Sequence, residues 1–203
     1  MGEIRQMDVG DVSSVVDVHL ASFTGFFLSG MGVPFLRKVY LSVLEDRTRI
    51  ALVYASEGAV VGFVVGVTDP RGYFRKTLEH SWLGFALASI PKMLKRPAVA
   101  LQLLRRLETQ RKAPFEEGHA SLMSIGVDPG QQGKGIGDQL IVAFLREAKS
   151  RGCSGVLLDT DAVNNDSANR FYVRAGFRLS RTYTTNEKRQ MNEYGYDLSK
   201  FQA

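Results

Sequence analysis

The chain has 203 residues, 44% of them hydrophobic, and a net charge of +5. This length and apolar content suit a single globular domain, and no window of about 18 apolar residues predicts a membrane-spanning helix. The positive charge gathers in residues 71–112, where ten basic residues stand against two acidic ones, so the rest of the chain carries −3. This uneven distribution argues against a nucleic-acid binder.

The single cysteine and the first residues indicate the compartment. Cys153 cannot form a disulfide within the chain, which fits a reducing environment. Residues 1–12 lack the charged and then apolar pattern of a signal peptide. We therefore expect a cytoplasmic protein.

The first seventy residues alternate between apolar strand patterns and helical spacing. In chain order, the predicted elements are a strand at 3–7, a helix at 12–23, a helix at 33–46, and strands at 49–55 and 59–69. Asp8 or Asp11 is the expected N-cap of the first helix. The dipeptide Glu57-Gly58 separates two β-branched runs, which predicts a hairpin.

Residues 71–116 break this pattern and predict a helical insertion between the third and fourth strands. Pro91 and Pro97 each restart a short helix, and apolar side chains recur beside the basic ones. One interpretation is a helical subdomain that packs on the sheet, or on a second copy of the chain in a homodimer. The other is a lid over the acceptor, or a basic patch at 71–112 that makes peripheral contact with an anionic membrane.

The second half returns to alternating strands and helices. Its predicted elements are a strand at 119–127, a helix at 134–151, a strand at 155–161, a helix from 164 to Gly176, and strands at 177–185 and 189–198. Strand and helix patterns mixed in this way predict an α/β fold with a mixed sheet.

A glycine-rich stretch, QQGKGIG at 131–137, joins the strand at 119–127 to the helix that follows it. Such loops hold phosphate, because helix N-terminal amides favour an anion. A Walker A loop is excluded, because Gly130 lies only two residues before Gly133-Lys134 and no Ser or Thr follows. A dinucleotide fingerprint is excluded too, because the third glycine is missing.

The remaining pattern resembles the GCN5-related N-acetyltransferase (GNAT) superfamily. Gln132, Gly135 and Gly137 match the family's Gln/Arg-x-x-Gly-x-Gly/Ala signature, placed between a strand and a helix. A second family segment follows, carried by Asn165, Ala168, Phe171, Tyr172, Gly176 and Phe177. The resemblance implies one domain over 1–203, with a mixed, mostly antiparallel sheet flanked by helices and the basic helical insertion at about 71–116.

The resemblance also implies acetyl-CoA as acyl donor, with its pyrophosphate on the glycine loop. Glycines let backbone N–H groups approach the phosphates without obstruction by a Cβ. The alternative is a loop that only makes a tight turn from strand to helix. The implied cofactor-binding residues are Ile125, Gly126, Val127, Gln132, Gly133, Lys134, Gly135, Ile136, Gly137, Asp138, Asn165 and Tyr172.

Acetyl transfer to an amine needs a base for the amine and a proton for the departing thiolate. Tyr172 matches the position where many family members place a tyrosine over the thiol, so it is the candidate general acid, with packing as its alternative role. Some relatives carry a glutamate where this chain has Ser121. His119 and Glu117, on the same side of that strand, are therefore the candidate bases. A water chain to Asp159 or Asp161 is the alternative.

The acceptor side is expected at the N-terminal helices and the last two strands. The candidate substrate-binding residues are His19, Phe23, Phe26 and Tyr194. The alternative role for the first three, which lie in one aromatic segment, is to cap the core. We expect an N-acetyltransferase of a small-molecule amine, with an amino sugar as one acceptor class. The alternatives are acetylation of a protein N-terminus or lysine, and a non-catalytic acyl-CoA sensor. Neither a metal nor a nucleic acid is expected.

Overall fold

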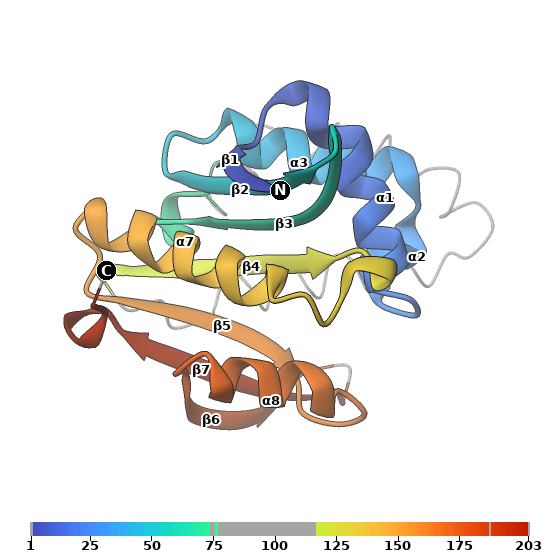
Figure 1. Ribbon diagram of the computed structural model, residues 1–203. Coiled ribbons are helices and arrows are strands. Elements are labelled where there is room, and N and C mark those ends of the chain that lie inside the picture. Colours follow the sequence, from blue (N-terminus) through green and yellow to red (C-terminus); the bar gives the residue numbers. More distant parts are fainter. Residues whose placement is uncertain (1, 74–75, 77–116, 187, 203) are drawn as a thin grey trace.

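The computed structural model describes residues 2–73, 76, 117–186 and 188–202 (Figure 1). The first half holds β1 (Glu3–Gln6), α1 (Val12–Ser22), α2 (Phe27–Met31), α3 (Val33–Glu45), β2 (Arg49–Ser56) and β3 (Ala59–Val67). The second half holds β4 (His119–Val127), α7 (Ile136–Ser150), β5 (Gly155–Asp161), α8 (Asp166–Arg174), β6 (Arg178–Thr184) and β7 (Gln190–Asp197).

These strands form one seven-stranded sheet in the order β1-β2-β3-β4-β5-β7-β6. All neighbours are antiparallel except β4 and β5. The structure confirms the predicted α/β fold with a mixed, mostly antiparallel sheet. The predicted insertion does lie between β3 and β4 in the chain, but its helices and its basic patch fall outside the described residues.

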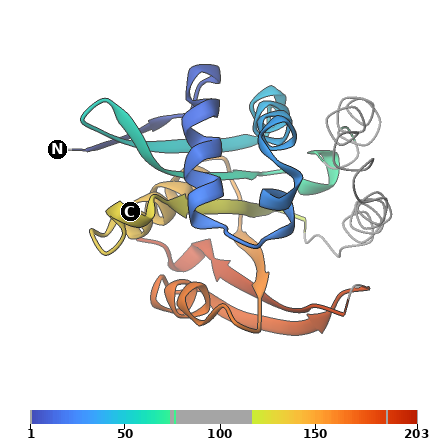
Figure 2. The same cartoon turned by 90° about the vertical axis from the view of Figure 1, so that its right-hand side faces the viewer.

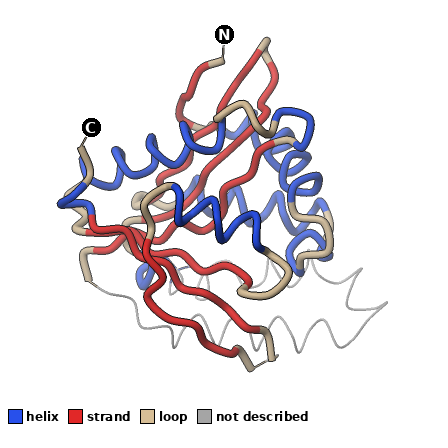
Figure 3. Tube along the Cα trace, turned by 60° about the horizontal axis from the view of Figure 1, so that its bottom comes forward, coloured by secondary structure: helices blue, strands red, loops and turns tan. Residues whose placement is uncertain are grey.

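The two halves of the sheet separate after a short contact. β4 and β5 pair only at His119, Ala120 and Ser121. Beyond this point the two strands diverge (Figure 1), and in Figure 3 the last three strands run in a different direction from β1–β3. The backbones of the C-terminal parts of β4 and β5 are therefore not paired with each other, and this backbone separation is called the opening below.

A bulge in β4 lies beside this opening. Val65 of β3 is opposite Ser124, whereas Gly66 is opposite Leu122, so Met123 is an extra residue in β4. Bulges bend a strand and increase its twist. Met123 lies two residues after Ser121, the last residue of β4 that pairs with β5.

Two apolar clusters hold the helices on opposite faces of the sheet. One face is covered by α1 and α3, through buried residues such as Val15 and Leu36. The other is covered by α7 and α8, through residues such as Leu140 and Phe144. Figure 2 shows α3 on one side of the sheet and α7 on the other.

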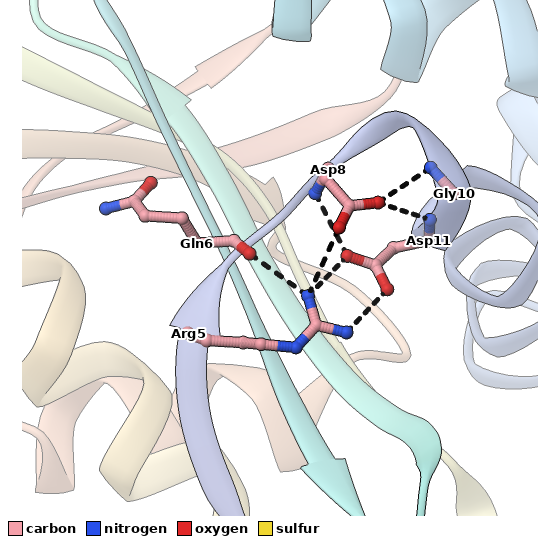
Figure 4. Close-up of polar contacts among 5 residues, drawn as sticks. All are labelled: Arg5, Gln6, Asp8, Gly10 and Asp11. Atoms are coloured by element: carbon pink, nitrogen blue, oxygen red, sulfur yellow. Dashed lines mark hydrogen bonds and ion pairs between the residues drawn. The ribbon is translucent and has the colours of Figure 1, made fainter.

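A polar cap joins β1 to α1 (Figure 4). Asp8 accepts hydrogen bonds from the amides of Gly10 and Asp11, while Asp11 accepts one from the Asp8 amide. Arg5 donates to both Asp11 oxygens at 2.7 Å. Asp8 therefore caps the short 3-10 turn Val9–Asp11 that leads into α1, whereas Asp11, the residue before α1, makes no side-chain cap bond to that helix and instead closes the capping box with Asp8.

Local geometry explains two differences from the predicted elements. α7 begins at Ile136 rather than at residue 134, because Gly133 and Gly135 adopt φ of 77° and 75°, outside the helical region. The aromatic segment after α1 contains the short helix α2, which is not among the predicted elements.

Candidate active site

The candidate site is the opening between β4 and β5. On the β3 side of β4, the Asp128 amide donates to the Val61 carbonyl at 2.9 Å. Backbone groups alternate along an antiparallel strand, so those of Ile125 and Val127 point the other way, into the opening. β5 does not pair with this part of β4 among the described residues. Ile125 therefore offers a donor and an acceptor to an extended ligand.

Two side chains already bind the Val127 carbonyl. Ser22 Oγ donates to it at 2.9 Å and Gln132 Nε2 at 3.3 Å. These bonds tie the end of α1 and the start of the glycine loop to the last residue of β4. Val127 thus keeps only its N–H for a ligand, and Gln132 helps to shape the loop.

The glycine loop presents backbone amides at the start of α7. Gly133 and Gly135 are both left-handed, and a Cβ at either position would meet no protein atom within 4 Å. Their hydrogens therefore face open space, where a ligand can approach the backbone. Lys134 Nζ bonds to Gln131 Oε1 at 2.7 Å, and the positive end of a 15-residue helix lies next to the loop.

The side-chain positions of two further loop residues, Gly137 and Ile136, lie against protein atoms. A Cβ at Gly137 would lie 3.3 Å from the Phe171 ring, so this glycine permits close packing of α7 on α8. Ile136 is buried in the core. Asp138, in the first turn of α7, forms an ion pair with Arg174 at 3.3 Å.

Asn165 and Asn169 organise the β5 side of the opening. Asn165 Nδ2 donates to Thr160 Oγ1 at 2.7 Å, which leaves its carbonyl oxygen for a ligand. Asn169, which the sequence analysis does not select, donates to the Asp161 carbonyl and accepts from Tyr194 Oη, both at 2.9 Å. The sequence feature that could have identified Asn169 is its position as a polar residue on the inner side of an amphipathic helix.

Tyr172 lies on α8 at the α7–α8 face of the opening. It is 8% exposed, and its ring centroid is 5.9 Å from those of both Phe177 and Tyr194. Its apolar cluster also contains Ile125 and Leu158, which flank the opening. Burial raises the pKa of the Tyr172 hydroxyl. The group is therefore protonated at neutral pH, which is the state that a proton donor requires.

Asp159 lies on the opposite face of the same opening. Its neighbour Leu158 packs in the α7–α8 cluster, so alternation points Asp159 away from it. Asp159 lies two positions past Leu157, the last residue of β5 that pairs with β4. Tyr183 Oη donates to Asp159 Oδ1 at 2.9 Å.

The surroundings of Asp159 raise the pKa of its carboxyl. Asp159 keeps contact with solvent, but the protein packed around the carboxyl limits its hydration, and the charge of Glu193 acts in the same direction. The hydrogen bond from Tyr183 and the charge of Arg181 oppose this rise. Arg181 also pairs with Glu193 at 2.6 Å, across β6 and β7.

The two bases expected from the sequence lie at the other end of β4. His119 is opposite Gly155, where β4 and β5 are still paired. Its Nδ1 is 3.3 Å from the Glu117 carbonyl oxygen. The Glu117 side chain is 93% exposed, in the turn before β4, and lies 3.9 Å from Arg71. The structure therefore does not bring either residue to the opening.

The predicted acceptor residues fall into two groups. A cavity of about 370 Å³ opens between the α1–α2 loop and the end of β5, lined by Thr24, Gly25, Phe26, Asp161, Val163, Asn164, Asn165 and Arg189. Phe26 thus lines the cavity. Phe23 packs beside Phe26, with a distance of 5.7 Å between the two ring centroids. His19 and Tyr194, by contrast, are each only 4% exposed.

A comparison with protein families identifies the family of this chain. The model of the acetyltransferase (GNAT) family matches residues 15–177. The chain belongs to this family. The match includes β4, the glycine loop and α8, which are the elements that form the opening.

Individual relatives extend the comparison. The sequence is 39% identical over 61 residues to a mycothiol acetyltransferase of Saccharopolyspora erythraea, a stretch that spans 30% of this chain and 20% of that protein. The ribosomal-protein-S18-alanine N-acetyltransferase from Escherichia coli has a similar fold, with a TM-score of 0.62 and 15% identity over 100% of this chain and 97% of that one. The PaiA N-acetyltransferase from Thermoplasma acidophilum, in complex with coenzyme A, also has a similar fold. Its TM-score is 0.58 and its sequence identity 14%, over 97% of this chain and 99% of that one.

The matched family is one of acyl-CoA-dependent acetyltransferases, whose acyl donor is acetyl-CoA. The residues present fit this GNAT ligand. The unpaired edge of β4 suits an extended arm, and the open glycine amides suit a pyrophosphate. Among the described residues, no cluster of His, Cys, Asp or Glu could hold a metal ion, and no helix could span a membrane.

A glycine substitution tests the loop. We expect Gly135→Ala to weaken acetyl-CoA binding at least about tenfold, because the new Cβ stands where the pyrophosphate must approach the backbone. Gly152→Ala, at the other end of α7, is the matched control, since Gly152 is also left-handed at φ 81° with no neighbour within 4 Å. Both variants should lose about 1–2 kcal/mol of unfolding free energy. Calorimetric titration should separate them, and equal affinities would contradict the role of the loop.

Proposed function

We propose that the protein transfers the acetyl group of acetyl-CoA directly to the primary amine of a small molecule. The observation that supports this proposal is that Tyr172 packs with Leu158 on the α7–α8 face of the sheet, whereas the next residue of β5, Asp159, points to the other face. In the tetrahedral intermediate the amine nitrogen must lose a proton and the sulfur must gain one, so a base and an acid at two separate positions around the acyl carbon serve the reaction.

Each residue at the opening then has a chemical task. Acetyl-CoA supplies the acyl group as a thioester with a thiolate leaving group. Asp159 takes a proton from the amine, directly or through one water. The Ile125 N–H donates to the acyl oxygen as negative charge develops there. The Tyr172 hydroxyl donates its proton to the departing sulfur.

Position along the strands favours Asp159 over the bases expected from the sequence. If the pairing of β4 and β5 continued, Asp159 would lie opposite Met123, at the bulge and next to the amides that face the opening. His119 and Glu117 lie before the opening begins. A raised pKa also makes the Asp159 carboxylate a stronger base than an ordinary aspartate.

The acceptor is proposed to bind in the cavity at the α1–α2 loop. Phe26 offers an apolar surface there, while Asn164 and the paired Asp161 and Arg189 offer hydrogen bonds without net charge. This combination favours a compact polar acceptor such as an amino sugar over a flexible peptide. A role in the cytoplasm, a homodimer and peripheral membrane contact through 71–112 remain proposals from the sequence.

A panel of amines tests the proposal. Release of free CoA should be measured with amino sugars, polyamines, and peptides that carry a free N-terminus or lysine. Turnover of an amino sugar or another small amine supports the proposal, whereas turnover of peptides alone favours a protein acetyltransferase. Acetyl-CoA binding without any turnover favours an acyl-CoA sensor, and absence of binding contradicts the ligand assignment.

A further inference from the structure

A row of charged side chains crosses the last three strands at the position of Asp159. Asp159 on β5 is opposite Glu193 on β7, and Glu193 is opposite Arg181 on β6. Residues directly opposite one another in an antiparallel ladder share a face of the sheet. Arg181 donates to Glu193 Oε2 through Nη2 at 2.6 Å and through Nε at 3.1 Å. The proposed mechanism uses only Asp159 from this row.

Tyr183 connects this row to the carboxylate of Asp159. It lies two positions after Arg181 on β6, so the two side chains are on the same face. The guanidinium carbon of Arg181 lies 5.0 Å from the centre of the Tyr183 ring, which is a cation–π contact. The Tyr183 hydroxyl donates to Asp159 Oδ1 at 2.9 Å. The ion pair on β6 and β7 therefore supports the tyrosine that binds Asp159.

The two carboxylate oxygens of Asp159 differ in their surroundings. Oδ1 accepts the hydrogen bond from Tyr183, whereas no described residue donates to Oδ2. The terminal torsion of an aspartate side chain is broad, so a carboxylate without partners rotates readily. The bond to Oδ1 restricts this rotation and leaves Oδ2 for a ligand.

We propose that Tyr183 is a positioning residue, which anchors Oδ1 of Asp159 so that Oδ2 meets the acceptor and takes the amine proton. The guanidinium of Arg181 holds the tyrosine ring, and the ion pair with Glu193 holds the guanidinium. A base fixed in this way meets the amine in one orientation, which lowers the barrier to proton transfer. This inference rests on the proposed transfer reaction, in which Asp159 is the base.

The groups in contact with Asp159 act on its pKa in different directions. The protein packed around the carboxyl raises the pKa, and the negative charge of Glu193 adds to this rise. The hydrogen bond from Tyr183 and the positive charge of Arg181 stabilise the carboxylate and lower the pKa. The other titratable side chains along this face of β4, β5 and β7 are His119, Asp161 and Asp197. They stay unchanged in the variants below, so they contribute equally to each pH profile.

Tyr183→Phe tests the inference against a matched control. The Asp159 carboxylate loses a stabilising bond in this variant, so the inflection of kcat/KM for the amine should move to higher pH. Well above the inflection, kcat/KM should still be about tenfold lower, because the carboxylate has lost its fixed orientation. Thr182→Val also removes a hydroxyl from β6, one that donates to Asn192 at 2.7 Å on the opposite face, and it should leave the profile unchanged. Equal profiles for the two variants would overturn the inference.

Glu193→Gln gives a second test with the opposite sign. It removes the negative charge opposite Asp159, so the pKa of Asp159 should fall, whereas it should rise in Tyr183→Phe. Glutamine can still accept a hydrogen bond from Arg181. The carboxyl carbon resonance of Asp159 measures both pKa shifts in the ligand-free protein, without turnover. Shifts of the same sign, or no shift in Tyr183→Phe, would overturn the inference. The expected shifts in a wild-type protein that turns over no amine would instead refute the proposed function, and the positioning role with it.

Discussion

Replacement of Asp159 by asparagine should lower kcat/KM for the amine about 100-fold, because asparagine cannot accept the proton. The variant should keep its affinity for acetyl-CoA, since the carboxyl faces away from the glycine loop and Tyr172. Tyr183 can still donate to the amide oxygen of the new side chain, so the packing of β5 and β6 should change little. Steady-state kinetics and calorimetry together separate these effects.

The pH profile gives this prediction a sharper test. The base acts as a carboxylate, so activity should rise with pH as Asp159 loses its proton. Its pKa is raised, so the inflection should lie above the ordinary aspartate value of about 3.9. The inflection should disappear in Asp159→Asn. The nearby charged groups, Glu193 and Arg181, remain in that variant and serve as an internal control.

Two further substitutions compare the candidate bases. His119→Ala and Glu117→Gln should each retain kcat/KM within about twofold, because both residues lie before the point where β4 and β5 separate. A large loss in His119→Ala together with an active Asp159→Asn would return the role of base to the β4 histidine. The three variants therefore show whether the general base is Asp159 or one of the two residues at the start of β4.

The strands of the site could be predicted from the sequence because their patterns are local. The bounds of β4 and β5 agree with the predicted ranges 119–127 and 155–161. The glycine loop was also predictable, since its spacing excludes the other phosphate motifs. Its left-handed glycines account for the later start of α7, a detail that residue spacing alone does not encode.

The sequence names Asp159 only as an alternative to His119 and Glu117, and the choice that we propose among them depends on where two strands separate. Nothing local to β4 shows that its pairing with β5 ends at Ser121. His19 presents the same difficulty. The sequence suggests His19 as an acceptor-binding residue, yet a tyrosine 21 positions later bonds to it inside the core. Contacts between distant segments decide both cases.

Replacement of Tyr172 by phenylalanine should lower kcat about 100-fold or more, because the departing thiolate then lacks its proton donor. The ring still fills its place between Phe177 and Tyr194, and no described residue hydrogen-bonds with the hydroxyl. Folding stability should therefore change by less than about 1 kcal/mol. The structure thus separates catalysis from packing at this position.

The control for Tyr172 is its neighbour Tyr194, which belongs to the same cluster. The Tyr194 hydroxyl donates to Asn169 at 2.9 Å, so Tyr194→Phe removes a buried hydrogen bond and should cost about 1 kcal/mol of stability. Its kcat should fall far less than that of Tyr172→Phe, because its hydroxyl points to Asn169 and not to the thiol. Unchanged turnover in Tyr172→Phe would make Tyr172 a packing residue. The thiolate would then have to take its proton from water, and the two faces of the opening would no longer carry separate tasks.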